Sequence, residues 1–513
     1  MSFARDITTV GGGTLMSRLL AYVRDALIAA LLGAGPYSQA LFAVLQVVNF
    51  FRRLLSEGAL NGAFVPIWLK LRSETDGAAN ADRFTRHVLL TMFCAASTTA
   101  LFAVFFAKFI IAAVAPGFDD TQRTFAALLL FMAAPYILFA GLVAIITAAL
   151  SAESRVGAVA ITTVLFNLVM VLALLILPEG PIESYQVTFL LALAVTAAGI
   201  VQLLVAAAVW LWTGKRWRRS SLRVGDQTGT FFRRALPGLI AAGIPQLKLI
   251  AATAIVSASP TAVAWLYYAN RLYELPLGIA SIGIAAVIMP RIAGTVRAGE
   301  ETPIAAAQSR AYEIAIGLAL PAAAGFALLA RPIAGGLFER GAFTAEDTAA
   351  VAAALMAICA GLPGHVLEKV FGAVSFAHED THTPMISALA GLIAAIILGV
   401  VLFVPLGYVG VAAAIALSAW IGAGLLGVML ARRGWLRVDQ AARRRLLRIG
   451  LATVVMAAAV YIANHAAAPA ADSAARLTVL AALVALGVAV YLGTLRLLGV
   501  VTFRELAALH RDP

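Results

Sequence analysis

Long apolar segments separated by short charged or Gly/Pro-containing loops run through the whole chain. A membrane-spanning helix needs about 20 mostly apolar residues, and about fourteen segments meet that length. They lie near 7–32, 38–69, 87–115, 123–150, 157–177, 186–213, 233–258, 261–290, 305–330, 347–374, 384–405, 408–431, 446–463 and 475–497. Runs of Leu, Ala, Val and Ile indicate helices, since a lipid-facing barrel would show alternation. The pattern predicts an all-α polytopic membrane protein with about fourteen transmembrane helices.

Composition supports this class and excludes others. Hydrophobic residues make up 62% of the chain and charged residues 12%, whereas soluble domains have roughly 45–50% and about 25%. A water-soluble enzyme, a nucleic-acid binder and a disordered scaffold are therefore excluded. Cys94 and Cys359 lie in separate apolar segments, so neither a disulfide framework nor a metal site is expected.

The charged loops predict the orientation. The formal net charge is +12, and clusters of Lys and Arg follow the even-numbered segments, near 70–86, 215–223, 291–297 and 432–445. The loops after odd-numbered segments carry acids, among them Asp119, Asp120 and Glu183. Basic loops stay on the cytoplasmic side. We therefore expect both termini in the cytoplasm, and a first segment that is a retained span rather than a signal peptide.

Short motifs recur in the two halves of the chain. The acidic–aromatic loop at Gly117–Asp120 resembles the one at Ala342–Asp347, and Pro135 has a counterpart in Pro363. Weak repetition of a six-span block is typical of two-lobed transporters. The sequence therefore predicts two six-helix lobes related by pseudo-two-fold symmetry, residues 1–220 and 221–435, followed by a C-terminal pair of helices in residues 436–513.

Charged residues also lie inside the predicted spans, where each Arg or Lys near the bilayer centre costs about 2.5–3.5 kcal/mol. In spans 1, 2, 7 and 8 the cations are Arg18, Arg24, Arg52, Arg53, Lys248 and Arg271, and the anions are Asp25, Glu57 and Glu274. Helical spacing pairs Arg53 with Glu57 and Arg271 with Glu274. Asp25 can pair with one arginine of span 1, and pairing or snorkelling explains part of the set. The cations outnumber the anions, so we expect a cationic cleft that attracts an anion. Arginine's planar fork suits phosphate.

The same residues carry a family resemblance. Four motifs stand out, namely Ser17-Arg18 with Arg24-Asp25, Asn49 with Arg52-Arg53 and Glu57, Tyr267–Leu272 with Glu274, and Leu337–Thr344. With these motifs the chain resembles the lipid II flippases of the MurJ (MviN) type, in the multidrug/oligosaccharidyl-lipid/polysaccharide exporter superfamily.

The resemblance implies a carrier rather than an enzyme. Such proteins move lipid II, the undecaprenyl-diphosphate-linked disaccharide-pentapeptide, from the cytoplasmic to the periplasmic leaflet by alternating access for peptidoglycan synthesis. Arg18, Arg24, Arg52 and Arg271 match the family's cavity arginines, and Arg53 and Lys248 are further candidates for substrate binding. The resemblance also implies a lipid-tail groove formed by the last two helices. No cofactor is expected, a monovalent coupling ion stays open, and the expected partners are lipid II, membrane lipids and other cell-wall synthesis proteins.

Three positions depart from the family pattern. Gln39 and Asn270 stand where the family usually has an acid, and Lys248 stands where an uncharged polar residue is more usual. We expect Asp25, Glu57, Glu274, Gln39 and Asn270 to balance charge or gate the cavity. The cleft should therefore be more positive than in other members.

Three alternatives stay open at this point. A flippase for another polyprenyl-diphosphate saccharide would need the same anion site. A cation-coupled multidrug antiporter of the same superfamily would favour acids over arginines in the first lobe, and twelve spans. A membrane-embedded glycosyltransferase would need catalytic acids, for which Glu339 and Asp347 are the candidates.

Overall fold

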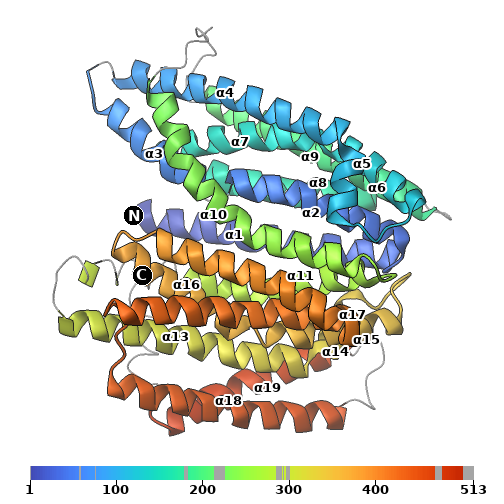
Figure 1. Ribbon diagram of the computed structural model, residues 1–513, viewed down its shortest axis with the longest axis vertical. Coiled ribbons are helices and arrows are strands. Elements are labelled where there is room, and N and C mark those ends of the chain that lie inside the picture. The colour runs from blue at the N-terminus through green and yellow to red at the C-terminus, as the bar shows by residue number, and fades with distance from the viewer. Residues whose placement is uncertain are drawn as a thin grey trace. The chain divides into compact units, whose positions relative to one another are not determined.

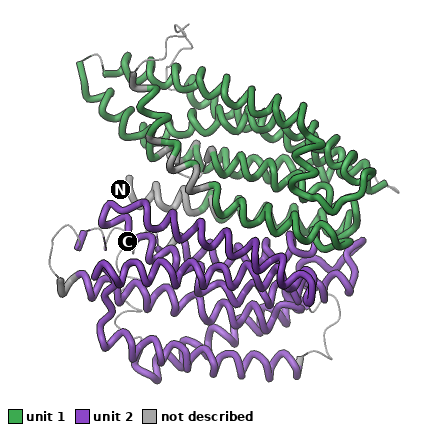
Figure 2. Tube along the Cα trace, in the orientation of Figure 1, with its two compact units in different colours: residues 1–263 green, residues 264–513 purple. Residues whose placement is uncertain are grey.

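The computed structural model is built from α-helices (Figure 1). It describes residues 2–56, 59–75, 77–177, 183–212, 226–284, 292, 294–295, 301–467 and 476–500. The chain forms two compact units, Met1–Val263 and Ala264–Pro513 (Figure 2).

The helices of the first unit are α1 (Ser2–Leu32), α2 (Pro36–Ser56), α3 (Ala59–Arg72), α4 (Gly77–Phe105), α5 (Ala107–Val114), α6 (Asp120–Ala133), α7 (Pro135–Ala152), α8 (Val156–Leu175), α9 (Ser184–Trp212) and α10 (Asp226–Val256). Those of the second unit are α11 (Ala262–Gly283), α13 (Glu301–Leu328), α14 (Ala330–Phe338), α15 (Ala345–Cys359), α16 (Leu362–Ala377), α17 (His382–Arg432), α18 (Gln440–Ala467) and α19 (Arg476–Leu497).

Each predicted apolar segment coincides with one helix, with part of one, or with two consecutive helices. This confirms the all-helical fold for the part of the chain that the structure describes. Eight helical stretches there are long and apolar enough to cross a membrane. The number of fourteen crossings stays a prediction.

The longest helix, α17, contains two of the predicted segments. Its 51 residues would rise about 75 Å, more than twice the hydrocarbon thickness of about 30 Å. The helix breaks at Gly407, which has φ 56° and ψ −140°, two residues after Pro405. A residue with a side chain rarely adopts this conformation, so the glycine permits the chain to turn between segments 384–405 and 408–431.

The two units repeat one succession of helices, as the short sequence motifs predict. In each unit a long helix (α4, α13) is followed by a helix of eight or nine residues (α5, α14). An acid then contributes to the cap of the next helix: Asp119 is the N-cap of α6 and accepts a hydrogen bond from the Gln122 amide at 2.7 Å, and Asp347 forms a capping box with Thr344, the N-cap of α15. A proline in the first turn opens the following helix, Pro135 in α7 and Pro363 in α16. This parallel supports the predicted internal repeat.

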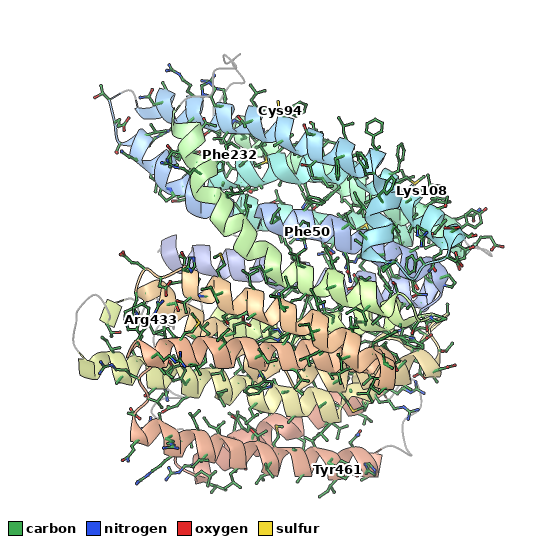
Figure 3. The ribbon with its side chains drawn as sticks, viewed as in Figure 1. Phe50, Cys94, Lys108, Phe232, Arg433 and Tyr461 are labelled. Carbon is green, nitrogen blue, oxygen red and sulfur yellow. The ribbon has the colours of Figure 1, made fainter. Side chains whose placement is uncertain are left out.

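Helix α10, which the sequence assigns to the second lobe, packs within the first unit. Its Phe231 contacts the rings of Phe64 on α3 and Phe84 on α4, with centroids 6.1 and 6.3 Å away. Phe50 of α2 also lies near α10, close to Gly243 (Figure 3). Helices α18 and α19 belong to the second unit. The lobe limits at 220 and 435 stay a prediction about the parts that move together.

The break in α17 can be tested by a Gly407→Ala substitution. The added methyl group meets nothing within 4 Å, but the positive φ costs an alanine about 1–3 kcal/mol. We expect a lower melting temperature of the purified protein in detergent. Gly424→Ala is the matched control, because Gly424 lies in the same helix with open space around it. Equal melting temperatures for the two variants would contradict this role of Gly407.

Candidate functional site: arginines in the two units and an apolar groove

Arg24 of α1 is buried and paired. Its Nε and Nη2 lie 2.9 and 2.7 Å from Oδ1 of Asp25, and the Asp25 side chain is fully buried. The sequence predicts that Asp25 pairs with an arginine of the first span, and the structure shows Arg24 to be that partner. A buried guanidinium without such a partner would be strongly destabilising.

Asn167 of α8 completes the contacts of Arg24. Its Oδ1 accepts a hydrogen bond from Arg24 Nη1 at 3.0 Å, and its Nδ2 donates to the carbonyl and hydroxyl oxygens of Ser17 at 3.0 and 3.1 Å. The Ser17 hydroxyl donates in turn to the Thr163 carbonyl at 3.0 Å. Asn167 therefore joins α1 to α8 at the level of the arginine. The sequence analysis missed this residue, although a lone Asn in an apolar span is a signal for interhelical hydrogen bonding.

Arg52 of α2 contacts Phe166, the residue of α8 just before Asn167. Its Nε donates to Asn49 Oδ1 at 3.1 Å, and its guanidinium lies over the Phe166 ring, 5.9 Å from the centroid. Arg24 and Arg52 are therefore both held against α8, at Asn167 and Phe166. Arg53 beside Arg52 is half-buried.

Arg18 differs from both. It is half-buried on α1, and no hydrogen bond, ion pair or ring contact engages its side chain within the described part of the chain. Of the two α1 arginines whose side chains the structure describes, Arg18 is therefore the one whose guanidinium the protein leaves open to a ligand.

The remaining candidates of the first unit lie on α2 and α10. Gln39 is 4% exposed and its Oε1 accepts no hydrogen bond from the described residues. Lys248 on α10 is 7% exposed. Glu57 lies outside the described residues, so its pairing with Arg53 stays a prediction.

The predicted pair of the second unit is confirmed on α11. Arg271 Nη1 lies 3.1 Å from Glu274 Oε2, with both side chains about one-quarter exposed. Asn270 beside them is half-buried. The Tyr273 hydroxyl lies 2.5 Å from His365 Nδ1 and links α11 to α16.

An elongated apolar cavity of about 800 Å³ lies in the second unit. Helices α13, α18 and α19 form most of its wall, with contributions from α11 and α14. Small residues open it: a Cβ at Gly325 would meet nothing within 4 Å, and Gly317 and Gly487 also line the wall. Helix α18, on which Figure 3 marks Tyr461, supplies Ile449, Met456 and Val460. We call this cavity the groove.

The acids proposed for a glycosyltransferase are engaged in structural contacts. Partial burial raises the pKa of Glu339, and hydrogen bonds from Arg476 and Thr348 lower it. The lowering effects together are larger, so the pKa of Glu339 lies below its ordinary value. Asp347 caps α15 and accepts a hydrogen bond from Trp265 Nε1 at 2.8 Å. Glu339 is thus a poor general acid. Within the described residues, no group of three or more His, Cys, Asp or Glu could hold a metal ion.

Comparison with known proteins identifies the family. The family model described as "Lipid II flippase MurJ" matches residues 28–478. The chain belongs to the MurJ family of lipid II flippases. This confirms the resemblance carried by the arginine motifs. Because the family consists of transporters, it also confirms that the chain is a multi-pass membrane transporter and not an enzyme.

Individual relatives agree with this assignment. A probable lipid II flippase MurJ of Rhizobium meliloti is 36% identical over 511 residues, which cover 96% of this chain and 93% of the relative. The lipid II flippase MurJ of Burkholderia cenocepacia is 28% identical, with 85% and 87% covered.

Solved structures show the same fold. A lipid II flippase MurJ in an inward closed conformation matches with a TM-score of 0.81 at 21% identity, over 97% of this chain and 99% of that one. An inward-facing multidrug resistance transporter of the MATE family matches with a TM-score of 0.65 at 16% identity, over 85% and 95%. Both matches show that this chain has the fold of these two proteins.

The role of Asn167 can be tested by an Asn167→Ala substitution. It removes an acceptor from Arg24 and a donor from Ser17 in a buried, apolar setting, where each lost partner costs about 1–3 kcal/mol. We expect a clear drop in the melting temperature of the detergent-solubilised protein.

Thr163→Val is the matched control on the same helix. The Thr163 hydroxyl bonds only to the Val159 carbonyl within α8, and the backbone carbonyl used by Ser17 is retained. If both variants melt like the wild type, Asn167 does not hold α1 against α8.

Proposed function

We propose that this chain translocates lipid II from the cytoplasmic to the periplasmic leaflet of the bacterial inner membrane by alternating access. Membership of the MurJ family, together with the arginines at 18, 24, 52 and 271, carries this proposal. The proposed orientation places both termini in the cytoplasm, on the basis of the basic loops.

The diphosphate is the part of lipid II that the arginines suit. Arg52 lies against α8, so it presents its guanidinium group without a large loss of side-chain entropy on binding. The Arg24 nitrogens already bond to Asp25 and Asn167, so Arg24 would bind phosphate by exchanging one of these partners. Arg18 has donors that the described chain does not use. Each guanidinium can donate two parallel hydrogen bonds to phosphate oxygens. We propose that these arginines bind the diphosphate, with Arg53 and Lys248 adding positive charge.

The second unit contributes Arg271. Its ion pair with Glu274 is partly exposed, so the pair can open at low cost when a phosphate competes for the guanidinium. Glu274, Asp25 and Glu57 would then balance charge when the substrate has left. The neutral Gln39 and Asn270 make the empty site more dependent on a bound anion.

The groove suits the polyprenyl tail. Its wall runs along α13 from Arg310 to Leu329, a rise of about 28 Å, close to the hydrocarbon thickness of about 30 Å. If the tail stays in the groove, the movement of the lobes has to carry only the headgroup across the membrane. Membrane lipids fill the groove when substrate is absent.

Two other substrates deserve comparison. Another polyprenyl-diphosphate saccharide would bind the same arginines, so headgroup contacts would decide between them. The fold is similar to that of a multidrug transporter of the MATE family, which would favour a cationic drug as substrate. A surplus of arginines repels cations, however, and the family match favours lipid II. Association with other cell-wall synthesis proteins belongs to the proposal as well.

Complementation tests the proposed role of the arginines. In a strain depleted of its own lipid II flippase, the wild-type chain should restore growth. Arg18→Ala and Arg271→Ala should fail, because each loses charge-assisted hydrogen bonds worth about 1.5–3 kcal/mol. Arg155→Ala is the control, since Arg155 is exposed at the start of α8. Growth of both test variants at wild-type protein level would exclude a binding role for these two arginines.

A groove-filling substitution tests the tail site. Gly325→Leu places a side chain in open space within the groove, so the fold should be retained while the tail is excluded. Transport of full-length lipid II into proteoliposomes should fall about tenfold or more, as expected when a buried apolar contact of this size is lost. An analogue with a shortened prenyl chain should be transported normally.

Gly493→Leu is the matched control on α19. Gly493 also has open space around it and does not line the groove. Equal transport by both glycine variants would place the tail elsewhere.

A further inference from the structure

One end of the groove carries charges that a hydrocarbon chain does not need. Glu313 of α13 is 4% exposed and lies between two arginines, Arg310 at 3.2 Å and Arg445 of α18 at 3.3 Å. Arg310 and Glu313 line the groove itself. The two arginine side chains are 42% and 45% exposed, so a ligand at this end can reach them.

The same end carries further positive charge. Arg448 lies one turn after Arg445 on the same face of α18, and its Nη1 donates to the Leu498 carbonyl at 2.9 Å, at the end of α19. Two guanidinium groups therefore pair with one carboxylate, and a third lies one turn further along α18. An ion pair that served only the fold would need a single partner for Glu313. We call Arg310, Glu313, Arg445 and Arg448 the mouth of the groove.

The length of the groove indicates what kind of molecule fits the mouth. A phospholipid of one leaflet reaches about half of the hydrocarbon thickness, or roughly 15 Å. The groove extends along α13 for about 28 Å from the mouth. One long prenyl chain fills this length, and a phosphate at its head would lie among the arginines. Charge and length together favour a polyprenyl diphosphate over an acidic phospholipid.

The groove also leads toward a cation that is already a candidate for substrate binding. Leu275 of α11 lines the groove, and Arg271 lies one turn earlier on the same helix face. Arg271 therefore lies one helical turn from a residue of the groove wall.

We propose that the mouth is a loading site for the diphosphate of polyprenyl diphosphate lipids arriving from the cytoplasmic leaflet. This inference rests on the proposed function, which supplies the substrate class. Arg310, Arg445 and Arg448 bind the phosphate oxygens, and Glu313 neutralises part of the charge of the two nearer arginines while the site is empty. The loading site is built from residues other than Arg18, Arg24 and Arg52.

Binding of undecaprenyl diphosphate, which lacks the saccharide, tests the proposal. The purified protein is placed in phosphatidylcholine nanodiscs and the dissociation constant is measured by titration. The Arg310→Gln/Arg445→Gln variant should bind about tenfold or more weakly, as for lost charge-assisted hydrogen bonds. Arg444→Gln is the matched control, because Arg444 is exposed on the same helix and does not line the groove. It should stay within about twofold of wild type. Equal weakening by the control would reduce the effect to general surface charge and overturn the proposal.

The double variant leaves Glu313 buried without its arginines, which can impair folding. The Arg310→Gln/Glu313→Gln/Arg445→Gln variant removes that charge and should show the same weakening. Glu313→Gln alone should tighten binding about threefold or more, because the arginines no longer share their charge with a carboxylate. A purely structural cluster predicts no gain, so weaker or unchanged binding by the Glu313→Gln variant would contradict the loading site.

Two further measurements separate the possible ligands and the two proposals. Undecaprenol, which lacks phosphate, should bind wild type and variants equally, and phosphatidylglycerol should displace undecaprenyl diphosphate only weakly. Strong displacement would make the mouth an acidic-phospholipid site and overturn the proposal. Arg18→Ala should lose transport, and the Arg310→Gln/Arg445→Gln change should weaken binding by the same factor in the Arg18→Ala background as in the wild type. If the wild-type chain fails to transport lipid II while binding still depends on Arg310 and Arg445, the proposed function fails and the loading site stands.

Discussion

Placing a guanidinium group inside a membrane span is costly unless other groups neutralise its charge and accept its hydrogen bonds. Arg24 shows how this chain meets the requirement. Asp25 neutralises the guanidinium at 2.7 Å, and Asn167 Oδ1 accepts a hydrogen bond from Arg24 Nη1 at 3.0 Å. These contacts connect α1 to α8 at the position of the charge. Arg52 approaches the neighbouring Phe166. Arg18 on the same helix as Arg24 has no such contacts in the described chain, and this difference separates an arginine that supports the fold from one that awaits a ligand.

The second unit handles its charges differently. Its arginines sit in pairs or clusters that remain partly open, as at Arg271–Glu274 and around Glu313. Partly exposed pairs are weak, and weak pairs can exchange partners with a phosphate. The glycines at 317, 325 and 487 leave room for a chain between α13, α18 and α19. Charge at one end and open apolar space behind it are what a lipid with a diphosphate head requires.

Much of this organisation could be predicted from the sequence, because a membrane-spanning helix needs about 20 mostly apolar residues, and segments of that length are visible in the sequence. The approximate positions of the helical segments, the repeated α4–α7 and α13–α16 order and the Arg271–Glu274 pair follow from local spacing. Asn167 could not be ranked as a partner of Arg24, since contacts between distant helices depend on packing. The groove is a space left by tertiary packing, and single glycines in the sequence of α13 do not predict it. The packing of α10 in the first unit has the same origin in Phe231, Phe64 and Phe84.

The central claim is that Arg18 and its neighbours are kept in the membrane to bind a diphosphate. An experimental structure of the protein with bound lipid II tests it most directly. The account predicts phosphate oxygens within hydrogen-bonding distance, about 2.7–3.0 Å, of the guanidinium nitrogens of Arg18 and at least one of Arg24, Arg52 and Arg271. A diphosphate bound away from all four, with Arg18 among acyl chains or tied to a carboxylate, would contradict it.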